Sequence, residues 1–217
     1  MENRTITITG KGKKSYRPDQ IIISMGYEKV TPEYDEALEK AAEYTNILKK
    51  EAISAGVEEK KIITKTFDVS PYEESYKDKD GDYHYRFAGY RASIEYAIKI
   101  PMDNKLLSKV LFALKDHKRG FKINYSMKNQ DEANSEAMEE AVKDAFKQAN
   151  TLAKAAGVTL GEILSISHSY GRIKIEDEYD RGMCLESTKM MLCAPEIDIN
   201  PNDIEVADTV NITWVIK

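Results

Sequence analysis

Apolar and polar residues alternate along several short stretches of the chain, which is the pattern of half-buried strands. The alternation is strictest at 5–9, where threonine and isoleucine take turns. Gly10, Gly12 and the lysines around them follow, and we interpret them as a basic hairpin turn. A second strand at 20–30 would then pair locally with the first. Further strands are expected at 62–71, 85–100, 121–127, 163–170 and 206–216.

Three other segments carry apolar residues at spacings of three and four, which predict amphipathic helices. The first runs from Thr31-Pro32 to Gly56, the second follows Asp103 and ends before Gly120, and the third covers 130–156. The pattern therefore predicts an α+β fold, a two-layer α/β arrangement. Its sheet would be mostly antiparallel, with about three helices on one face.

The end of the first predicted helix is similar to the end of the third. A shift of 101 residues superposes Ala55-Gly56-Val57 on Ala156-Gly157-Val158, and Ile62-Ile63 on Ile163-Leu164. We interpret this as an internal helix–strand–strand repeat, with units roughly at 31–100 and 130–217, inside a single domain 1–217. A groove where the units meet could hold a small ligand or an active site, and plain packing between them is the alternative.

Composition and charge exclude several classes of protein. The 217 residues include 32 basic and 37 acidic side chains, so the formal net charge is −5 and nucleic acid is not an expected partner. No apolar run reaches the ~18 residues that a membrane-spanning helix needs. The N-terminus, Met1-Glu2-Asn3-Arg4, lacks the features of a signal peptide, so we expect a cytoplasmic protein as written. A bacterial envelope or periplasmic location is the alternative if a leader was removed.

Apparent ligand-binding motifs fail on inspection. Gly10 to Lys14 resembles a phosphate loop, but no helix is predicted to follow it. Asp78, Asp80 and Asp82 suggest calcium, yet Tyr76 and Phe87 would occupy the two end positions of the loop, which need carboxylates. We interpret this segment as a solvated hairpin tip and expect no metal or cofactor.

Catalytic motifs are also lacking in the sequence. The three histidines have no metal-ligand spacing. His168 lies between Ser167 and Ser169, but neighbours on a strand point to opposite faces, so these hydroxyls are poor partners. We therefore expect no catalytic residue and a non-enzymatic protein. An enzyme or ligand-binding protein that uses His168, Tyr170 and nearby carboxylates is the competing hypothesis.

The two cysteines, Cys184 and Cys193, leave three interpretations open. In a reducing compartment they are expected to be free thiols. A disulfide or redox pair is the second interpretation. A soft-metal site with neighbouring methionines is the third, because thiolate and thioether ligands suit Cu(I).

Tyrosines gather around one predicted hairpin, between the strands at 62–71 and 85–100. Tyrosine is common at protein interfaces because it covers a large area and keeps a polar group. Strand propensity explains part of this enrichment. We nevertheless predict an interaction surface there, made of Tyr72, Tyr76, Tyr83, Tyr85 and Tyr90.

The order of several short motifs resembles the SIMPL-domain family, a bacterial domain of unknown function. The matching stretches cover nearly the whole chain. They are Ile8-Thr9-Gly10-Lys11-Gly12 with Pro18-Asp19, Gly56-Val57 with Ile62-Ile63-Thr64 and Pro71-Tyr72, Gly89-Tyr90-Arg91-Ala92, the run from Glu136 to Gly161, and Pro201 to Ile212.

The resemblance implies a modest set of properties. Members of the family are often exported to the bacterial envelope, assemble into oligomers, and include immunogenic and oxidative-stress-related proteins. No catalytic residues are established for them, so none is carried over. We therefore predict a self-associating homo-oligomeric interaction or stress-related protein. Contacts are expected through strand edges, the tyrosine-rich hairpin or the long irregular segment 171–205.

Overall fold

The structure is a computed structural model that describes residues 4–117, 120–169 and 199–217. Within these ranges the chain forms seven strands and three α-helices, and all strand pairs are antiparallel. The elements are β1 (Thr5–Tyr16), β2 (Gln20–Thr31), α1 (Tyr34–Ser54), β3 (Ile62–Lys77), β4 (Tyr83–Pro101), α2 (Asn104–Ala113), β5 (Phe121–Ser126), α3 (Gln130–Ala155), β6 (Leu160–Ser169) and β7 (Ile204–Ile216), with a 3₁₀ turn at Glu59–Lys61.

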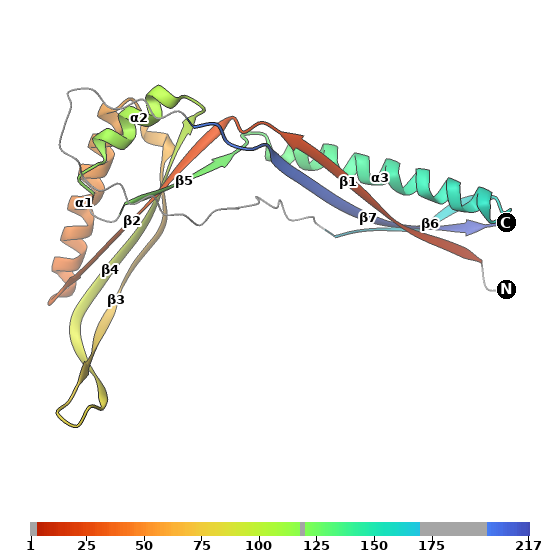
Figure 1. The fold of residues 1–217 in the computed structure, drawn as a ribbon. Helices are drawn as coiled ribbons and strands as arrows, with labels where there is room; N and C mark the ends of the chain where they lie inside the picture. The colour runs from red at the N-terminus through yellow and green to blue at the C-terminus, as the bar shows by residue number, and fades with distance from the viewer. Residues whose placement is uncertain (1–3, 118–119, 170–198) are drawn as a thin grey trace. The chain divides into compact units, whose positions relative to one another are not determined.

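These elements divide into two compact units (Figure 1). Unit 1 contains β1, α3, β6 and β7, and its sheet has the order β1-β7-β6. Unit 2 contains β2, α1, β3, β4, α2 and β5, and its sheet has the order β3-β4-β2-β5. The predicted α+β class, antiparallel strands and three helices are confirmed. The single sheet was wrong, because the strands form two sheets, and the single-domain organisation stays a prediction.

The core of unit 2 lies between its sheet and the helices α1 and α2. Alternate residues of β2 and β4 face the helices, and Ile23 lies opposite Ile98 in the register of the two strands. Asp103 begins α2 because its carboxylate accepts hydrogen bonds from the N–H groups of Lys105 and Leu106, at 2.9 and 3.1 Å. Helix α2 then adds its buried leucines and valine to the same core.

The core of unit 1 forms where α3 packs on β1 and β7. The buried face of α3 is a row of alanines at intervals of four residues: Ala133, Ala137, Ala141, Ala145, Ala149 and Ala153. Ile8, Ile212 and Trp214 face this row from the sheet. Because the alanines are short, the helix axis comes close to the strands.

Gly10 and Gly12 are the positions of closest approach, and they are not turn residues. A Cβ on Gly10 would lie 2.0 Å from the carbonyl oxygen of Ala141, and one on Gly12 would lie 1.9 Å from that of Ala137. Strand β1 therefore continues through both glycines to Tyr16. The predicted basic turn at Gly10–Lys14 was wrong because these glycines serve helix packing.

The predicted local pairing of the first two strands was also wrong. Strand β1 pairs with β7, so that Thr5 lies opposite Val215 and Tyr16 opposite Ile204. Strand β2 pairs with β4 and β5 in the other sheet. Without a tight turn at the glycines, nothing local forces β1 and β2 to become neighbours.

We predict that Gly12→Ala destabilises unit 1 by about 1–3 kcal/mol, because the new methyl group overlaps the helix backbone. Trp214, the chain's single tryptophan, is buried in unit 1, so its fluorescence during chemical denaturation measures the effect. Gly26→Ala in β2 is the matched control, since a Cβ there meets nothing within 4 Å. Equal stability of Gly12→Ala and the wild type would contradict the close-packing explanation.

Candidate functional site

Strands β3 and β4 form a two-stranded extension of unit 2, which we call the arm (Figure 1), and four of the five predicted tyrosines lie on it. Strand β2 ends at Thr31, opposite Tyr90 of β4. Strands β3 and β4 continue together beyond that point as a hairpin, with Lys77 opposite Tyr83 at its far end. We define the arm as residues 72–89. In the described part of the chain, β4 has no neighbour other than β3 between Tyr83 and Gly89.

One face of the arm carries three exposed aromatic side chains, which we call the aromatic face: Tyr83, Tyr85 and Phe87. They alternate along β4 and are 67%, 71% and 56% exposed. Phe87 contacts Tyr90 edge-on at 5.4 Å, and Tyr90 contacts Tyr34 of α1 at 5.5 Å. The aromatic face therefore continues the core side of the unit 2 sheet past the beginning of α1.

On the other face of the arm, the tyrosines contact arginines of the same chain. The guanidinium of Arg86 lies over the ring of Tyr76 at 5.4 Å, and that of Arg91 lies over Tyr72 at 5.3 Å. Arg86 also donates to the carboxylate of Glu74 at 2.6 Å. The structure thus divides the five predicted tyrosines. Tyr83 and Tyr85 lie on the aromatic face, Tyr90 continues that face to the core of unit 2, and Tyr72 and Tyr76 lie on the other face.

Phe87 is a residue of the aromatic face that the sequence prediction missed. The prediction grouped residues by type and therefore took tyrosines alone. Alternation along the strand at 83, 85 and 87 would have found it, because residues two apart share a face.

The tip of the arm is closed by Asp78. One of its oxygens accepts the N–H groups of Asp80 and Asp82, each at 3.0 Å, and the other lies 2.7 Å from Nε2 of His84. These hydrogen bonds, that of His84 first, lower the pKa of Asp78. The carboxylate of Asp78, which the sequence suggested as a calcium ligand, therefore stabilises the turn.

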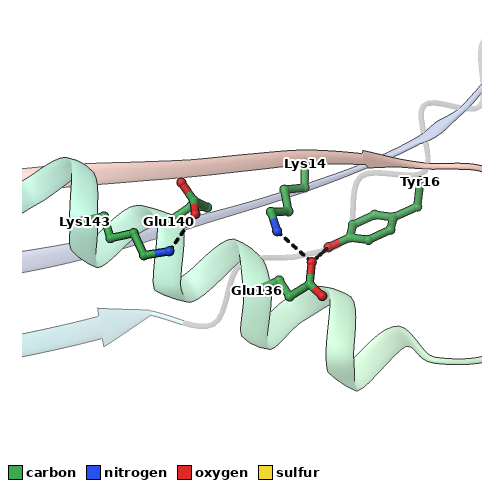
Figure 2. Close-up of polar contacts among 5 residues, drawn as sticks. All are labelled: Lys14, Tyr16, Glu136, Glu140 and Lys143. Carbon is green, nitrogen blue, oxygen red and sulfur yellow. Dashed lines mark hydrogen bonds and ion pairs between the residues drawn. The ribbon is translucent and has the colours of Figure 1, made fainter.

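A polar cluster in unit 1 joins the end of β1 to α3 (Figure 2). Lys14 and Tyr16 both donate to the same oxygen of Glu136, each at 2.7 Å. One helical turn further along, Lys143 donates to Glu140 at 2.9 Å. The backbone N–H of Lys11 donates to Asp144 at 2.9 Å. Side chains of α3 thus contact β1 over much of its length.

The protonation states of this cluster favour a structural role. Partial burial and the bond to Glu136 raise the pKa of Tyr16 to about 12. The hydrogen bond to Glu136 raises the pKa of Lys14, and the same contact lowers the pKa of Glu136. A nucleophilic lysine or a tyrosine base would need the opposite shifts. The cluster therefore holds its protons and fastens β1 to α3.

Comparison with family models provides the classification. Residues 6–214 match the model of SIMPL, described as a protein of unknown function (DUF541). The chain belongs to the SIMPL family. Comparison with curated proteins finds no match.

In this SIMPL protein, His168 has a carboxylate partner that the sequence did not indicate. Its Nε2 lies 2.8 Å from Asp208 on the neighbouring strand β7. Asp208 is buried and its other oxygen accepts the N–H of Thr209. The diagonal placement of residues 168 and 208 on paired strands could have been found only with the register of β6 and β7. Tyr170 lies outside the described residues, as do Cys184 and Cys193.

Over 4–117, 120–169 and 199–217, no helix is long and apolar enough to cross a membrane. The same ranges hold no group of three or more histidine, cysteine or acidic residues arranged to bind a metal ion. A cavity of about 600 Å³ lies at Lys49, Glu58, Glu59 and Lys60, and it is open to solvent and lined mainly by charged side chains.

We predict that Tyr16→Phe lowers the stability of unit 1 at pH 7 by about 1 kcal/mol, since one hydrogen bond is lost. It should also flatten the alkaline loss of stability. Folding raises the pKa of Tyr16 from 10 to about 12, so its stabilisation is complete below pH 10 and is lost between pH 10 and about 12.

Denaturation followed by Trp214 fluorescence at several pH values measures both effects. Tyr85→Phe is the matched control, because it removes an exposed hydroxyl group from the other unit and should follow the wild type. If Tyr16→Phe loses stability above pH 10 as steeply as the wild type, the assigned role of Tyr16 is wrong.

Proposed function

We propose that this SIMPL protein is a non-enzymatic, self-assembling protein and that the arm is its principal contact. The observation that carries the proposal is the aromatic face, where Tyr83, Tyr85 and Phe87 are all more than half exposed. The core of unit 2 does not reach these side chains, because β2 ends at Thr31 and α1 begins at Tyr34.

Physical chemistry favours a partner for such an extension. An isolated two-stranded hairpin is at best marginally stable in water. Among the described residues, the edge of β4 in the arm is also unpaired, and unpaired edges are templates for strand addition. Burial of this exposed aromatic hairpin against another protein surface would stabilise it.

We also infer that the two units are copies of one strand–helix–strand–strand motif. In unit 1 the sheet order is first, last and middle strand: β1-β7-β6. Unit 2 contains the same order in β2-β4-β3 and adds α2 and β5. Support also comes from the helix ends, which share one hydrogen-bonding pattern.

In that pattern, Gly56 and Gly157 have positive φ angles of 106° and 67°. The N–H of Val57 donates to Ala52 at 3.0 Å, and that of Val158 donates to Ala153 at 3.0 Å. Each glycine also donates to the carbonyl three residues before it, which completes a Schellman cap in both helices. The predicted repeat at 31–100 and 130–217 would then include β2 and β1 as well.

Other expectations stay predictions. They include a stress-related role, a cytoplasmic or envelope location, and a ligand site between the repeat units. The contact between His168 and Asp208 is an orienting pair without an assigned substrate, so self-assembly remains the better supported proposal.

A shortened arm tests the proposal. Replacing Ser75–Tyr85 by Asn-Gly joins the paired residues Glu74 and Arg86 through a two-residue turn and removes most of the aromatic face. We expect the wild type to form oligomers and the shortened variant to have the mass of one chain in size-exclusion chromatography with light scattering.

Tyr76→Thr is the matched control, since it removes an aromatic ring from the opposite face of the same arm and should retain the wild-type mass. Far-UV circular dichroism and Trp214 fluorescence check that each variant is folded. A monomeric wild type, or a shortened variant of unchanged mass, would overturn the proposal.

A further inference from the structure

Strand β6 in unit 1 is a second open edge with exposed apolar side chains. It pairs with β7 only, in the described part of the chain. Helix α3 packs mainly on β1 and β7 and barely touches β6. Ile163 and Ile166 lie opposite the buried residues Trp214 and Ile212, so they face the helix side of the sheet, yet they are 39% and 59% exposed.

The helix side of β6 is bordered by further apolar residues of α3. Met138, Val142 and Phe146 recur every four residues beside the alanine row. Phe146 contacts Trp214 edge-on at 5.4 Å, which places this row on the side of β7 and β6. Met138 and Phe146 are 37% and 38% exposed. These side chains form one apolar surface along β6 and the flank of α3. We call it the apolar ledge and define it as Met138, Val142, Phe146, Ile163 and Ile166.

The other edge of the same sheet is protected. Helix α3 supplies Asp144 to the backbone N–H of Lys11 on β1 and Glu136 to Lys14 and Tyr16. Strand β1 also carries several lysines, which oppose strand addition. Strand β6, by contrast, has Glu162 as its one acidic or basic side chain apart from His168. Of these two edges, β6 is the one suited to accept a strand.

We propose that the arm of one copy adds its β4 edge to β6 of a second copy, antiparallel to it. This rests on the proposed self-assembly and names its acceptor. The edge of β4 in the arm and the edge of β6 are complementary. Each is unpaired among the described residues, and each has its exposed apolar side chains on the helix side of its sheet. Adding the arm to β6 would extend the unit 1 sheet to five strands and cover the apolar ledge.

One register satisfies both the apolar and the charged residues. Leu164 is a bulge residue, skipped in the pairing with β7. We place Leu164 in a bulge in the pairing with the arm as well. Tyr85 then lies opposite Ile163, and Tyr83 lies opposite Ile166. In the same register, Arg86 lies opposite Glu162. The aromatic face then meets the apolar ledge. On the opposite face of the extended sheet, the exposed Glu162 would lie beside Arg86. Apart from His84, Arg86 is the one acidic or basic residue of 83–89.

The contact is heterologous, since donor and acceptor are different surfaces of the same chain. Such contacts build open chains or rings, of which a reciprocal pair of copies is the smallest, and every one of them requires β6. This property separates the proposal from pairing between two arms, which would give dimers that need no β6.

Complementation between two variants provides the test. The donor-less variant has Ser75–Tyr85 replaced by Asn-Gly, and the acceptor-less variant is Ile166→Lys, which places a charge where the aromatic face would lie. Each alone should have the mass of one chain, which is 24.7 kDa for the unshortened sequence, and an equimolar mixture should form a 1:1 heterodimer with the summed mass of the two variants. Light scattering on a sizing column measures the masses.

Ser167→Lys is the matched control, because it adds the same charge to the opposite face of β6 and should assemble like the wild type. Trp214 fluorescence verifies that the unit 1 core is intact in both lysine variants. If Ile166→Lys keeps the wild-type mass, or the mixture does not form a heterodimer, the β6 acceptor is wrong. If the donor-less variant also keeps the wild-type mass, the proposed role of the arm fails as well.

Discussion

The limited reach of the helices is the constraint on which the rest of this structure depends. Each sheet has helices on one face, and the helices are narrower or shorter than the sheet beneath them. In unit 1 the alanine row brings α3 so close to Gly10 and Gly12 that it covers β1 and β7 and leaves β6 at its flank. In unit 2 the cover ends near Tyr34, while β4 extends to Tyr83. Both uncovered regions keep the apolar pattern of a core.

The close packing of α3 on β1 and the open edge at β6 therefore have the same cause, which is the position of α3 on the sheet. The alanine row gives α3 a tight contact with β1, and Asp144 and Glu136 close that edge with hydrogen bonds. The same position of α3 leaves Ile163 and Ile166 without cover. Partial burial and the hydrogen bond to Glu136 raise the pKa of Tyr16, so this contact keeps its proton and strengthens the closed edge. The exposed apolar residues at the open edges are the surfaces that we propose as contacts between copies.

The sequence predicted the elements of the fold well because their signals are local. The spacing of apolar residues located the helices, Asp103 marked the beginning of α2, and Gly56 and Gly157 marked two helix ends. The pairing of the strands could not be predicted in the same way, since it depends on contacts between distant segments, such as Thr5 with Val215. Gly10 and Gly12 were misinterpreted because a glycine in a turn and a glycine under a helix look alike in sequence.

The tyrosine-rich hairpin was located correctly, but its two faces became distinct only with the register of β3 and β4. Phe87 belongs with Tyr83 and Tyr85, whereas Tyr76 belongs with Arg86. The exposed apolar residues of β6 had no local signal, because their exposure depends on where α3 lies. Apolar residues at an uncovered edge have the same pattern as apolar residues in a core.

Amide hydrogen exchange as a function of protein concentration is the decisive test of strand addition between the arm and β6, since it reports on backbone pairing at both edges in the unmodified protein. We expect amides in 83–89 and in 160–169 to become protected together as concentration rises, while those of β1 do not change. Protection that rises in the arm alone, or in neither segment, would contradict it.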